Sequence, residues 1–285
     1  MYKRQGIDIA LFAGGSISKD FAPHAVKAGA VVIDNSSAFR MDPEVPLVVP
    51  EVNPQAILKH KGIIANPNCS TIIMVMALKP IYDLAKIKRV IVSTYQAVSG
   101  AGKEGIDELD AQVREHSEGR EMTANILPSA SAEKHYPIAF NLIPQIDVFC
   151  DNLYTKEEMK MVNETKKIME DYEMRITATT IRVPVYRSHS ESVNIELEKE
   201  VDLGAMREAL AKFPGVTVQD DPSKQEYPMP LYTSEKDDVY VGRLRRDESC
   251  EKSYNMWVVG DQIRKGAALN TLPVSYTHLR AHETR

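Results

Sequence analysis

The chain is poor in cysteine and has no long apolar run. Its three cysteines, Cys69, Cys150 and Cys250, are too widely spaced for a disulfide framework or a zinc-binding motif, and they suit a reducing compartment. No apolar stretch approaches the roughly 20 residues needed to span a bilayer, and the N-terminus carries no signal-peptide pattern. We therefore expect a cytoplasmic protein with no membrane partner and no metal site.

An excess of positive charge is also missing. The net charge is −5 and the isoelectric point is near 5.9, so nothing favours nucleic acid or an anionic membrane as a partner. Hydrophobic residues make up 43% and charged residues 26%, as is typical of a globular protein, and 285 residues suffice for one large domain or two ordinary ones. The N-terminal part of the chain lacks the dinucleotide-binding fingerprint GxGxxG, whose spacing occurs only later, at Gly100, Gly102 and Gly105.

What stands out is a cysteine at a predicted junction between a strand and a helix. Residues 63–65 resemble the end of a buried strand, and the apolar run 72–78 has helical periodicity, with Ser70 and Thr71 as candidate N-terminal caps. Because the free N–H groups of a first helical turn stabilise an anion, we expect a lowered pKa for the Cys69 thiol. Asn68 could donate to a developing oxyanion. An inert buried cysteine is the alternative, but the polar neighbours favour a nucleophile.

The preceding segment has the pattern of a strand–helix–strand unit. Strands are predicted at 7–12 and 31–33, with a helix at 20–28 between them, which implies parallel strands with a ligand edge at their carboxyl ends. Gly14 and Gly15 in the first loop would let a backbone approach a phosphate or ribose, although a plain turn is the commoner explanation. Arg40 follows the second strand, where it is placed to meet an anionic substrate unless it is simply a solvated surface residue.

The remainder predicts a sheet with helices. Residues 89–98 form a strand that runs into a loop with Ser99 and Gly100, and Thr155 with Glu158 forms a capping box for a helix ending near residue 171. Glu157 and Lys160 share a face of that helix, for which a surface ion pair is the ordinary reading. A kink is expected near Pro80. Further strands are predicted at 176–185, 192–198, 216–219, 239–245 and 255–259, and helices at 103–117, 203–212 and 263–270.

Acyl chemistry on a cysteine needs a proton donor or acceptor, a group to hold the carbonyl and a charged clamp. The chain offers His189, Gln96 and Arg182 for these tasks. The set resembles the aspartate-semialdehyde dehydrogenase family, over roughly residues 6–270 and in family order. The resemblance rests on NPNCST at 66–71, YQAVSGAG at 95–102, EEMK at 157–160 with ETKKI at 164–168, RVPV at 182–185 leading to HSE at 189–191, VGRLRRD at 241–247 and KGAALN at 265–270.

The resemblance implies a role for each matching residue. Cys69 would be the nucleophile that carries an acyl thioester, His189 the general acid and base, and Gln96 the group that holds the acyl carbon's oxygen. Arg182 would clamp the substrate carboxylate and Glu157 would meet its amino group. The substrate phosphate would bind Arg40 and Lys160. The NADP site would be lined by Gly14, Gly15, Ser36, Ser37, Ser99, Gly100 and Asn270.

The implied reaction is the NADPH-dependent reductive dephosphorylation of L-4-aspartyl phosphate to L-aspartate 4-semialdehyde and phosphate. The product would feed lysine (diaminopimelate), methionine and threonine synthesis. The implied fold is a partial Rossmann-like NADP-binding domain, at 6–68 plus 261–272, with an inserted α+β catalytic domain at 69–260 that contains a mixed sheet and forms a homodimer. Family members begin with a glycine-rich loop and continue past Asn270, so we expect residues 1–5 and 273–285 to be non-native, NADP binding to be weak and turnover to be low.

Four alternatives stay open on the sequence. N-acetyl-glutamyl-phosphate reductase shares the architecture and cysteine chemistry, although its cysteine turn differs and the Glu157/Lys160 helix favours the aspartyl enzyme. Glyceraldehyde-3-phosphate dehydrogenase is more distant, because the spacing of Arg182 and His189 argues against it. An inactive fragment that survives as a dimerisation domain is a third possibility. A cysteine hydrolase is the last, but no third group orients His189.

Overall fold

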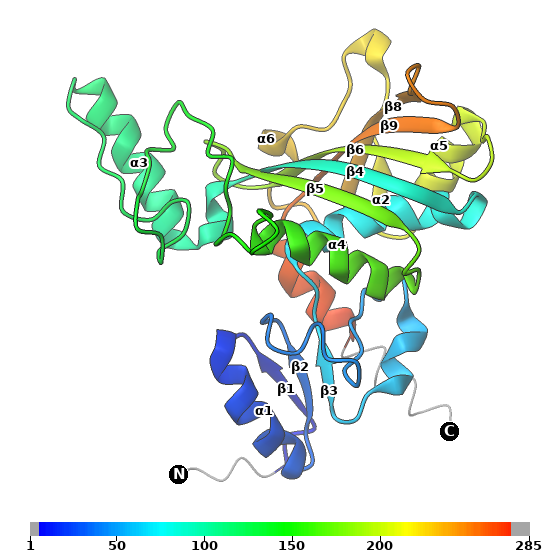
Figure 1. Ribbon diagram of the computed structural model, residues 1–285, viewed down its shortest axis with the longest axis horizontal. Helices are drawn as coiled ribbons and strands as arrows, with labels where there is room; N and C mark the ends of the chain where they lie inside the picture. Colours follow the sequence, from blue (N-terminus) through cyan, green and yellow to red (C-terminus); the bar gives the residue numbers. More distant parts are fainter. Residues whose placement is uncertain (1–5, 275–285) are drawn as a thin grey trace.

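The computed structural model describes residues 6–274, which form two sheets connected through a central helix (Figure 1). The smaller sheet holds three parallel strands in the order β1 (Ile9–Phe12), β2 (Val31–Asp34) and β3 (Ile63–Ala65). Helix α1 (Ser18–Lys27) connects the first two strands. The predicted strand–helix–strand unit is confirmed, and the carboxyl ends of its strands lead into the loops that approach the larger sheet.

The larger sheet has six strands in the order β5-β4-β6-β9-β8-β7. It is mixed, as predicted, because β4 runs parallel to β5 and β7 parallel to β8, while the other neighbours are antiparallel. The strands are β4 (Ile87–Gln96), β5 (Arg175–Arg182), β6 (His189–Leu197), β7 (Val216–Val218), β8 (Val239–Arg246) and β9 (Ser253–Gly260).

The main hydrophobic core lies between this sheet and helix α2 (Cys69–Leu84), which is buried along most of its length because its residues are apolar on every side. The helix continues through Pro80, which is buried, and the kink expected there stays a prediction. The prediction of Ser70 or Thr71 as the N-cap is wrong. The cap is Asn68, because its side chain reaches the first free N–H groups.

Other helices pack on this core or on smaller clusters. Helix α4 (Lys156–Met169) contacts both α2 and the edge strand β5, and its predicted capping box is present. The remaining elements are α3 (Lys103–Ser117), α5 (Leu203–Lys212), α6 (Pro230–Thr233), the 3₁₀ turns η1 (Gly15–Ile17), η2 (Pro54–Lys59), η3 (Val98–Ala101) and η4 (Pro222–Lys224), and the π-turn η5 (Arg264–Ala268).

The end of the described chain differs from expectation. A helix was predicted at 263–270, broken by Pro273, but a π-turn over η5 leads into helical residues 269–274. Val274 is fully buried and packs in a small core with Ile33 and Ile64, so helical order continues past Pro273. The remaining residues for which a non-native origin was expected, 1–5 and 275–285, lie outside the described residues.

Strand register brings three predicted site residues to one end of the large sheet. Gln96 pairs with Arg182 across β4 and β5, and Tyr95 pairs with Ser190 across β4 and β6. His189 therefore lies next to Gln96, on the side away from Arg182. Three side chains that are distant in sequence are thus aligned by hydrogen bonding between neighbouring strands.

Candidate active site

Cys69 is the first residue of α2, as the sequence predicts. The Asn68 Oδ1 accepts hydrogen bonds from the N–H groups of Ser70 at 3.1 Å and Thr71 at 3.3 Å, which fixes the start of the helix. The π-turn η5 packs directly on this point. A Cβ added at Gly266 would lie 2.8 Å from the Cys69 Cβ, so only glycine fits there without displacing the cysteine.

The predicted lowering of the Cys69 pKa is wrong for the ligand-free protein. Burial, and after it the Glu157 carboxylate, raise the pKa of the thiol to about 12 against the opposing effects of Arg40, the Ser70 N–H and Arg182. The helix start stabilises a thiolate, but desolvation and a nearby negative charge outweigh it. The thiol is therefore protonated at neutral pH until a ligand changes its surroundings.

Cys69 opens onto a cavity of about 510 Å³ between the two sheets. Charged side chains of both signs surround it, which is the arrangement expected for a zwitterionic or phosphorylated ligand. The predicted site residues that line it are Gly15, Ser36, Ser37, Arg40, Asn68, Cys69, Gln96, Gly100, Glu157, Lys160 and Arg182. Gly14, Ser99, His189 and Asn270 are not part of this lining.

Glu157 is the hub of a buried hydrogen-bond network beside Cys69. Its carboxylate accepts from the Asn68 Nδ2 at 3.0 Å, the Gln96 Nε2 at 3.3 Å and the Lys160 Nζ at 3.1 Å. Burial acts to raise the pKa of Glu157, but the Lys160 ammonium and the Asn68, Lys160 and Gln96 hydrogen bonds together lower it. The ion pair expected between Glu157 and Lys160 is therefore present, but its expected place at the surface is wrong, because Glu157 is only 5% exposed.

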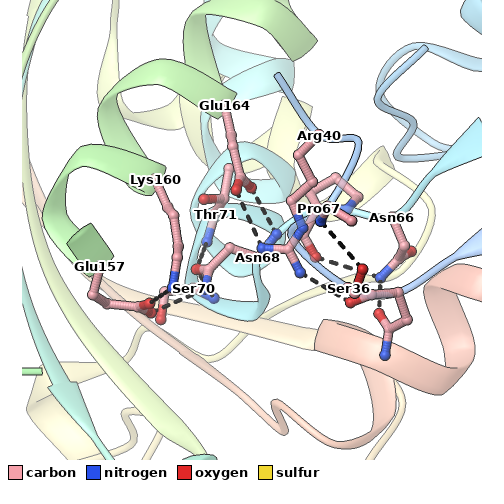
Figure 2. Close-up of polar contacts among 12 residues, drawn as sticks. Ser36, Arg40, Asn66, Pro67, Asn68, Ser70, Thr71, Glu157, Lys160 and Glu164 are labelled. Atoms are coloured by element: carbon pink, nitrogen blue, oxygen red, sulfur yellow. Dashed lines mark hydrogen bonds and ion pairs between the residues drawn. The ribbon is translucent and has the colours of Figure 1, made fainter. Parts of the chain in front are cut away.

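The same network changes the expectation for Asn68. Its Oδ1 caps α2 and its Nδ2 donates to Glu157, so in this structure the side chain orients other groups (Figure 2). The oxyanion-donor role predicted for Asn68 stays a prediction.

Arg182, the last residue of β5, carries a buried positive charge beside the cavity. Its Nη1 donates to the Ala97 carbonyl at 2.8 Å, and its Nε has no hydrogen-bond partner among the described residues. Burial lowers the pKa of Arg182, while the charges of Glu157 and Cys69 raise it. A guanidinium with an unused N–H beside a cavity is suited to bind a carboxylate in a two-point contact.

Two acidic residues that were not predicted as site residues from the sequence bind Arg40 and Lys160. Glu164 accepts from the Arg40 Nη1 at 3.2 Å, and Asp147 accepts from the Lys160 Nζ at 3.0 Å (Figure 2 for Glu164). Glu164 lies two helical turns after Glu157, so helical spacing could have placed both on one face. Asp147 lies in an irregular loop and gave no such signal.

His189 is fully buried behind this lining. Its Nδ1 accepts from the Ala97 N–H at 3.1 Å, so the neutral imidazole carries its proton on Nε2, which has no partner among the described residues. Burial and the neighbouring Arg182 charge lower the pKa of His189 well below its ordinary value. A Cβ at Gly100 would lie 2.7 Å from the Arg182 Nη1 and 3.3 Å from the His189 Nε2. Gly100 therefore lets both side chains approach the cavity wall.

The residues at the other end of the cavity fit a nicotinamide dinucleotide. Gly15, with φ +64°, and Ser36 lie after the parallel strands β1 and β2, the edge where such cofactors bind. Asn270 is fully buried, and its Nδ2 donates to the Val48 carbonyl and the Asn66 Oδ1, while its own Oδ1 has no partner in the described range 6–274. Ser99 accepts from the Gln262 side chain instead of facing the cavity.

Two further observations concern membrane-spanning helices and metal-binding groups. Within residues 6–274, no helix has the length and apolar character needed to cross a membrane. The same residues contain no group of three His, Cys, Asp or Glu side chains that could hold a metal ion.

Comparison with known proteins gives a consistent result. Residues 2–60 match the family described as "Semialdehyde dehydrogenase, NAD binding domain", and residues 78–265 match "Semialdehyde dehydrogenase, dimerisation domain". The chain is 57% identical over 274 residues to the aspartate-semialdehyde dehydrogenase of Aquifex aeolicus, covering 95% of this chain and 79% of that protein. It is 53% identical over 273 residues to the Bacillus subtilis enzyme, with the same coverage. The chain belongs to the aspartate-semialdehyde dehydrogenase family.

Solved structures of the family agree with the fold described above. The crystal structure of aspartate semialdehyde dehydrogenase II from Vibrio cholerae superposes with a TM-score of 0.90 at 46% identity, covering 96% of this chain and 80% of that one. A second structure of the same protein, described as complexed with ASA, matches equally well. The predicted family and fold class are confirmed. The chain is therefore an oxidoreductase of amino-acid biosynthesis that uses a nicotinamide cofactor, and the alternative of an N-acetyl-glutamyl-phosphate reductase is not favoured.

Proposed function

We propose that this aspartate-semialdehyde dehydrogenase binds L-4-aspartyl phosphate with its reacting carbonyl at Cys69. The observation that carries the proposal is the charge arrangement of one cavity, in which Cys69 lies among the Glu157 carboxylate and the Arg182 and Arg40 guanidinium groups. Glu157 would bind the substrate ammonium and Arg182 its α-carboxylate. Arg40, with Lys160, would bind the phosphate, because both are cations that line the same cavity.

The first chemical step is attack by the Cys69 sulfur on the acyl phosphate. A bond forms between Sγ and the carbonyl carbon, the bond from that carbon to the phosphate oxygen breaks, and phosphate leaves with the electron pair. The ligand-free thiol is protonated, and the Glu157 charge helps to keep it so. A substrate ammonium bound at Glu157 would neutralise that charge and favour loss of the thiol proton, which the departing phosphate would take up.

The acyl group then remains on Cys69 as a thioester. Gln96 would hold its carbonyl, since the side chain lines the cavity and is fixed by contacts with Thr94 and Glu157. His189 would donate a hydrogen bond from its Nε2–H to the developing oxygen, through the gap that Gly100 leaves. The cofactor, when bound, supplies the hydride that converts the thioester carbon to the aldehyde level.

We infer that the cofactor is NADP, held by Gly14, Gly15, Ser36, Ser37, Ser99, Gly100 and Asn270. Support comes from the parallel-strand edge at which the first four of these residues lie and from the unpaired Asn270 Oδ1. One structural neighbour, the Candida albicans enzyme, is described as bound to NADP, at 24% identity and a TM-score of 0.72.

We further propose that residues 6–68 and 261–272 form the cofactor-binding domain and residues 69–260 the catalytic domain. The latter would form a homodimer in the cytoplasm, which is consistent with the description of the matching family as a dimerisation domain.

Mass spectrometry of the intact protein after incubation with aspartyl phosphate tests the assignment of Cys69. We expect a mass increase of one aspartyl group on Cys69, with release of one equivalent of phosphate and no need for cofactor. The Cys69→Ala variant should show neither, whereas Cys150→Ala, which removes a cysteine outside the cavity, should behave as wild type. An adduct on Cys150, or phosphate release by Cys69→Ala, would contradict the proposal.

A further inference from the structure

We propose that Glu164 is a positioning residue that fixes the phosphate-binding Arg40 relative to the start of the Cys69 helix. The proposal rests on the role proposed above for Arg40. The Glu164 carboxylate is 1% exposed and points from α4 toward both groups (Figure 2). One oxygen accepts from the Arg40 Nη1 at 3.2 Å, and the other accepts from the Asn68 backbone N–H at 2.7 Å.

The two partners of Glu164 come from separate parts of the chain. Arg40 follows β2 of the parallel sheet, whereas Asn68 caps α2, which belongs to the core of the large sheet. A single carboxylate therefore links the two halves of the site. Burying a carboxylate is unfavourable unless it is paired and hydrogen-bonded, and here both oxygens are used in that way.

The link leaves Arg40 with a fixed orientation. Its Nη2 donates to the Asn35 carbonyl at 3.0 Å, so with Glu164 the guanidinium is held from two directions while it lines the cavity. Lys167, one turn further along α4, holds the backbone that follows. Its Nζ donates to the carbonyls of Arg40 at 2.8 Å, Asp42 at 2.6 Å and Val45 at 2.8 Å.

A guanidinium oriented before the substrate arrives loses less conformational entropy when it binds phosphate. The loss of Glu164 should therefore weaken binding of the acyl phosphate more than it slows attack by Cys69. Glutamine at position 164 keeps the volume and one acceptor oxygen but turns the other into a donor. It can then serve only one of the two partners.

A second cavity, of about 570 Å³, lies near the C-terminal end of α4, but it does not support a comparable proposal. Two of the lysines that line it, Lys59 and Lys61, are paired with Glu170 and Glu44.

The test measures the burst of phosphate released as aspartyl phosphate acylates Cys69, over a range of substrate concentrations and without cofactor. For Glu164→Gln we expect the half-saturating concentration to rise about tenfold and the maximal burst rate to stay within about twofold of wild type. The matched control is Glu158→Gln. Glu158 lies in the same helix, is buried and accepts two backbone N–H groups, from Thr155 and Thr180, but it lies outside the cavity. It should lower stability and leave the half-saturating concentration unchanged.

Two further variants separate the ways in which the proposal can fail. Arg40→Ala should raise the half-saturating concentration, and adding Glu164→Gln to it should raise it no further, because Glu164 acts through Arg40. No effect of Arg40→Ala would refute the proposed phosphate role itself. A normal half-saturating concentration in Glu164→Gln, with an altered one in Arg40→Ala, would refute only the positioning role. If Glu164→Gln does not fold, Glu164→Asp, which keeps the charge on a shorter side chain, is judged by the same two quantities.

Discussion

Helix α4 carries two stripes with the same helical spacing but different surroundings. The core stripe lies toward α2 and the large sheet, and the site stripe lies toward the cavity that holds Cys69 and Arg40. The core stripe consists of Glu158, Met161, Thr165 and Ile168, and the site stripe of Glu157, Lys160, Glu164 and Lys167. Glu157 and Glu164 are as well covered as Met161, at 5%, 1% and 0% exposure. Burial on α4 is therefore decided by what lies opposite each stripe, and charge in the site stripe is balanced by the Glu157–Lys160 pair within the helix and by Arg40 and Asp147 from other segments.

The site stripe should control substrate binding, and Glu157→Gln is expected to have the largest effect. It removes the charge proposed to bind the substrate ammonium but keeps the shape. We expect the ratio of burst rate to half-saturating concentration to fall about 1,000-fold, equivalent to about 4 kcal/mol, because a buried cation would lose its charged partner. The burst assay described above measures this ratio. A fall smaller than about tenfold would show that the ammonium binds elsewhere.

The core stripe should control stability alone, and Met161→Ala tests this. Met161 is fully buried in the main hydrophobic core, so its truncation should lower the free energy of unfolding by about 3 kcal/mol. Urea unfolding followed by circular dichroism measures that change. The half-saturating concentration for aspartyl phosphate should not move in the folded protein. A several-fold change would mean that the two stripes are not energetically separate.

The contrast between the stripes also explains what the sequence could and could not predict. The Thr155 capping box correctly predicted the start of helix α4, but the core stripe was not predicted from the sequence. The site stripe has the same Glu and Lys spacing as a solvated helix surface, so this spacing by itself predicts a surface ion pair between Glu157 and Lys160. Nothing local shows that the Arg40 loop covers this face, and Glu164 was missed for that reason.

The cysteine shows the same limit. Its position between β3 and α2 followed from a local pattern, because a short strand, a capping residue and an apolar run are adjacent in sequence. Its pKa did not, since burial and the Glu157 carboxylate depend on segments distant in the chain. The choice of Asn68 over Ser70 and Thr71 as the cap was also undetermined, because the three are good capping residues within four positions.

The Lys160→Met variant tests the contribution of a site-stripe residue that is less buried than Glu157. The Lys160 ammonium lies between Glu157 and Asp147, and burial lowers its pKa less than these two carboxylates raise it. Methionine keeps most of the side-chain volume without the charge. We expect a rise of about tenfold in the half-saturating concentration of aspartyl phosphate, because one of two phosphate-binding cations is lost. An unchanged value would assign the phosphate to Arg40 alone.

The smallest effect that we predict concerns pH, and it distinguishes the two glutamates of the site stripe. The pKa of Glu157 is lowered because Lys160 and neighbouring hydrogen bonds outweigh burial, so its contribution to stability is present above its ordinary pKa and is lost as pH falls through the folded value. The pKa of Glu164 is raised because burial outweighs Arg40 and the Asn68 N–H, so its contribution is greatest below its ordinary pKa and is lost as pH rises through the folded value.

The two variants should therefore change acid sensitivity in opposite directions. Between pH 7 and about pH 3.5, Glu157→Gln should lose less unfolding free energy than wild type, since it lacks a group that destabilises the fold on protonation. Glu164→Gln should lose more, since it lacks a group whose protonation favours the folded state. Urea titrations at the two pH values give the four differences needed, with Glu170→Gln, at an exposed ion pair, as the control. A shift of both variants in the same direction would mean that the two carboxylates, although both buried on one stripe of α4, experience the same balance of burial and charge.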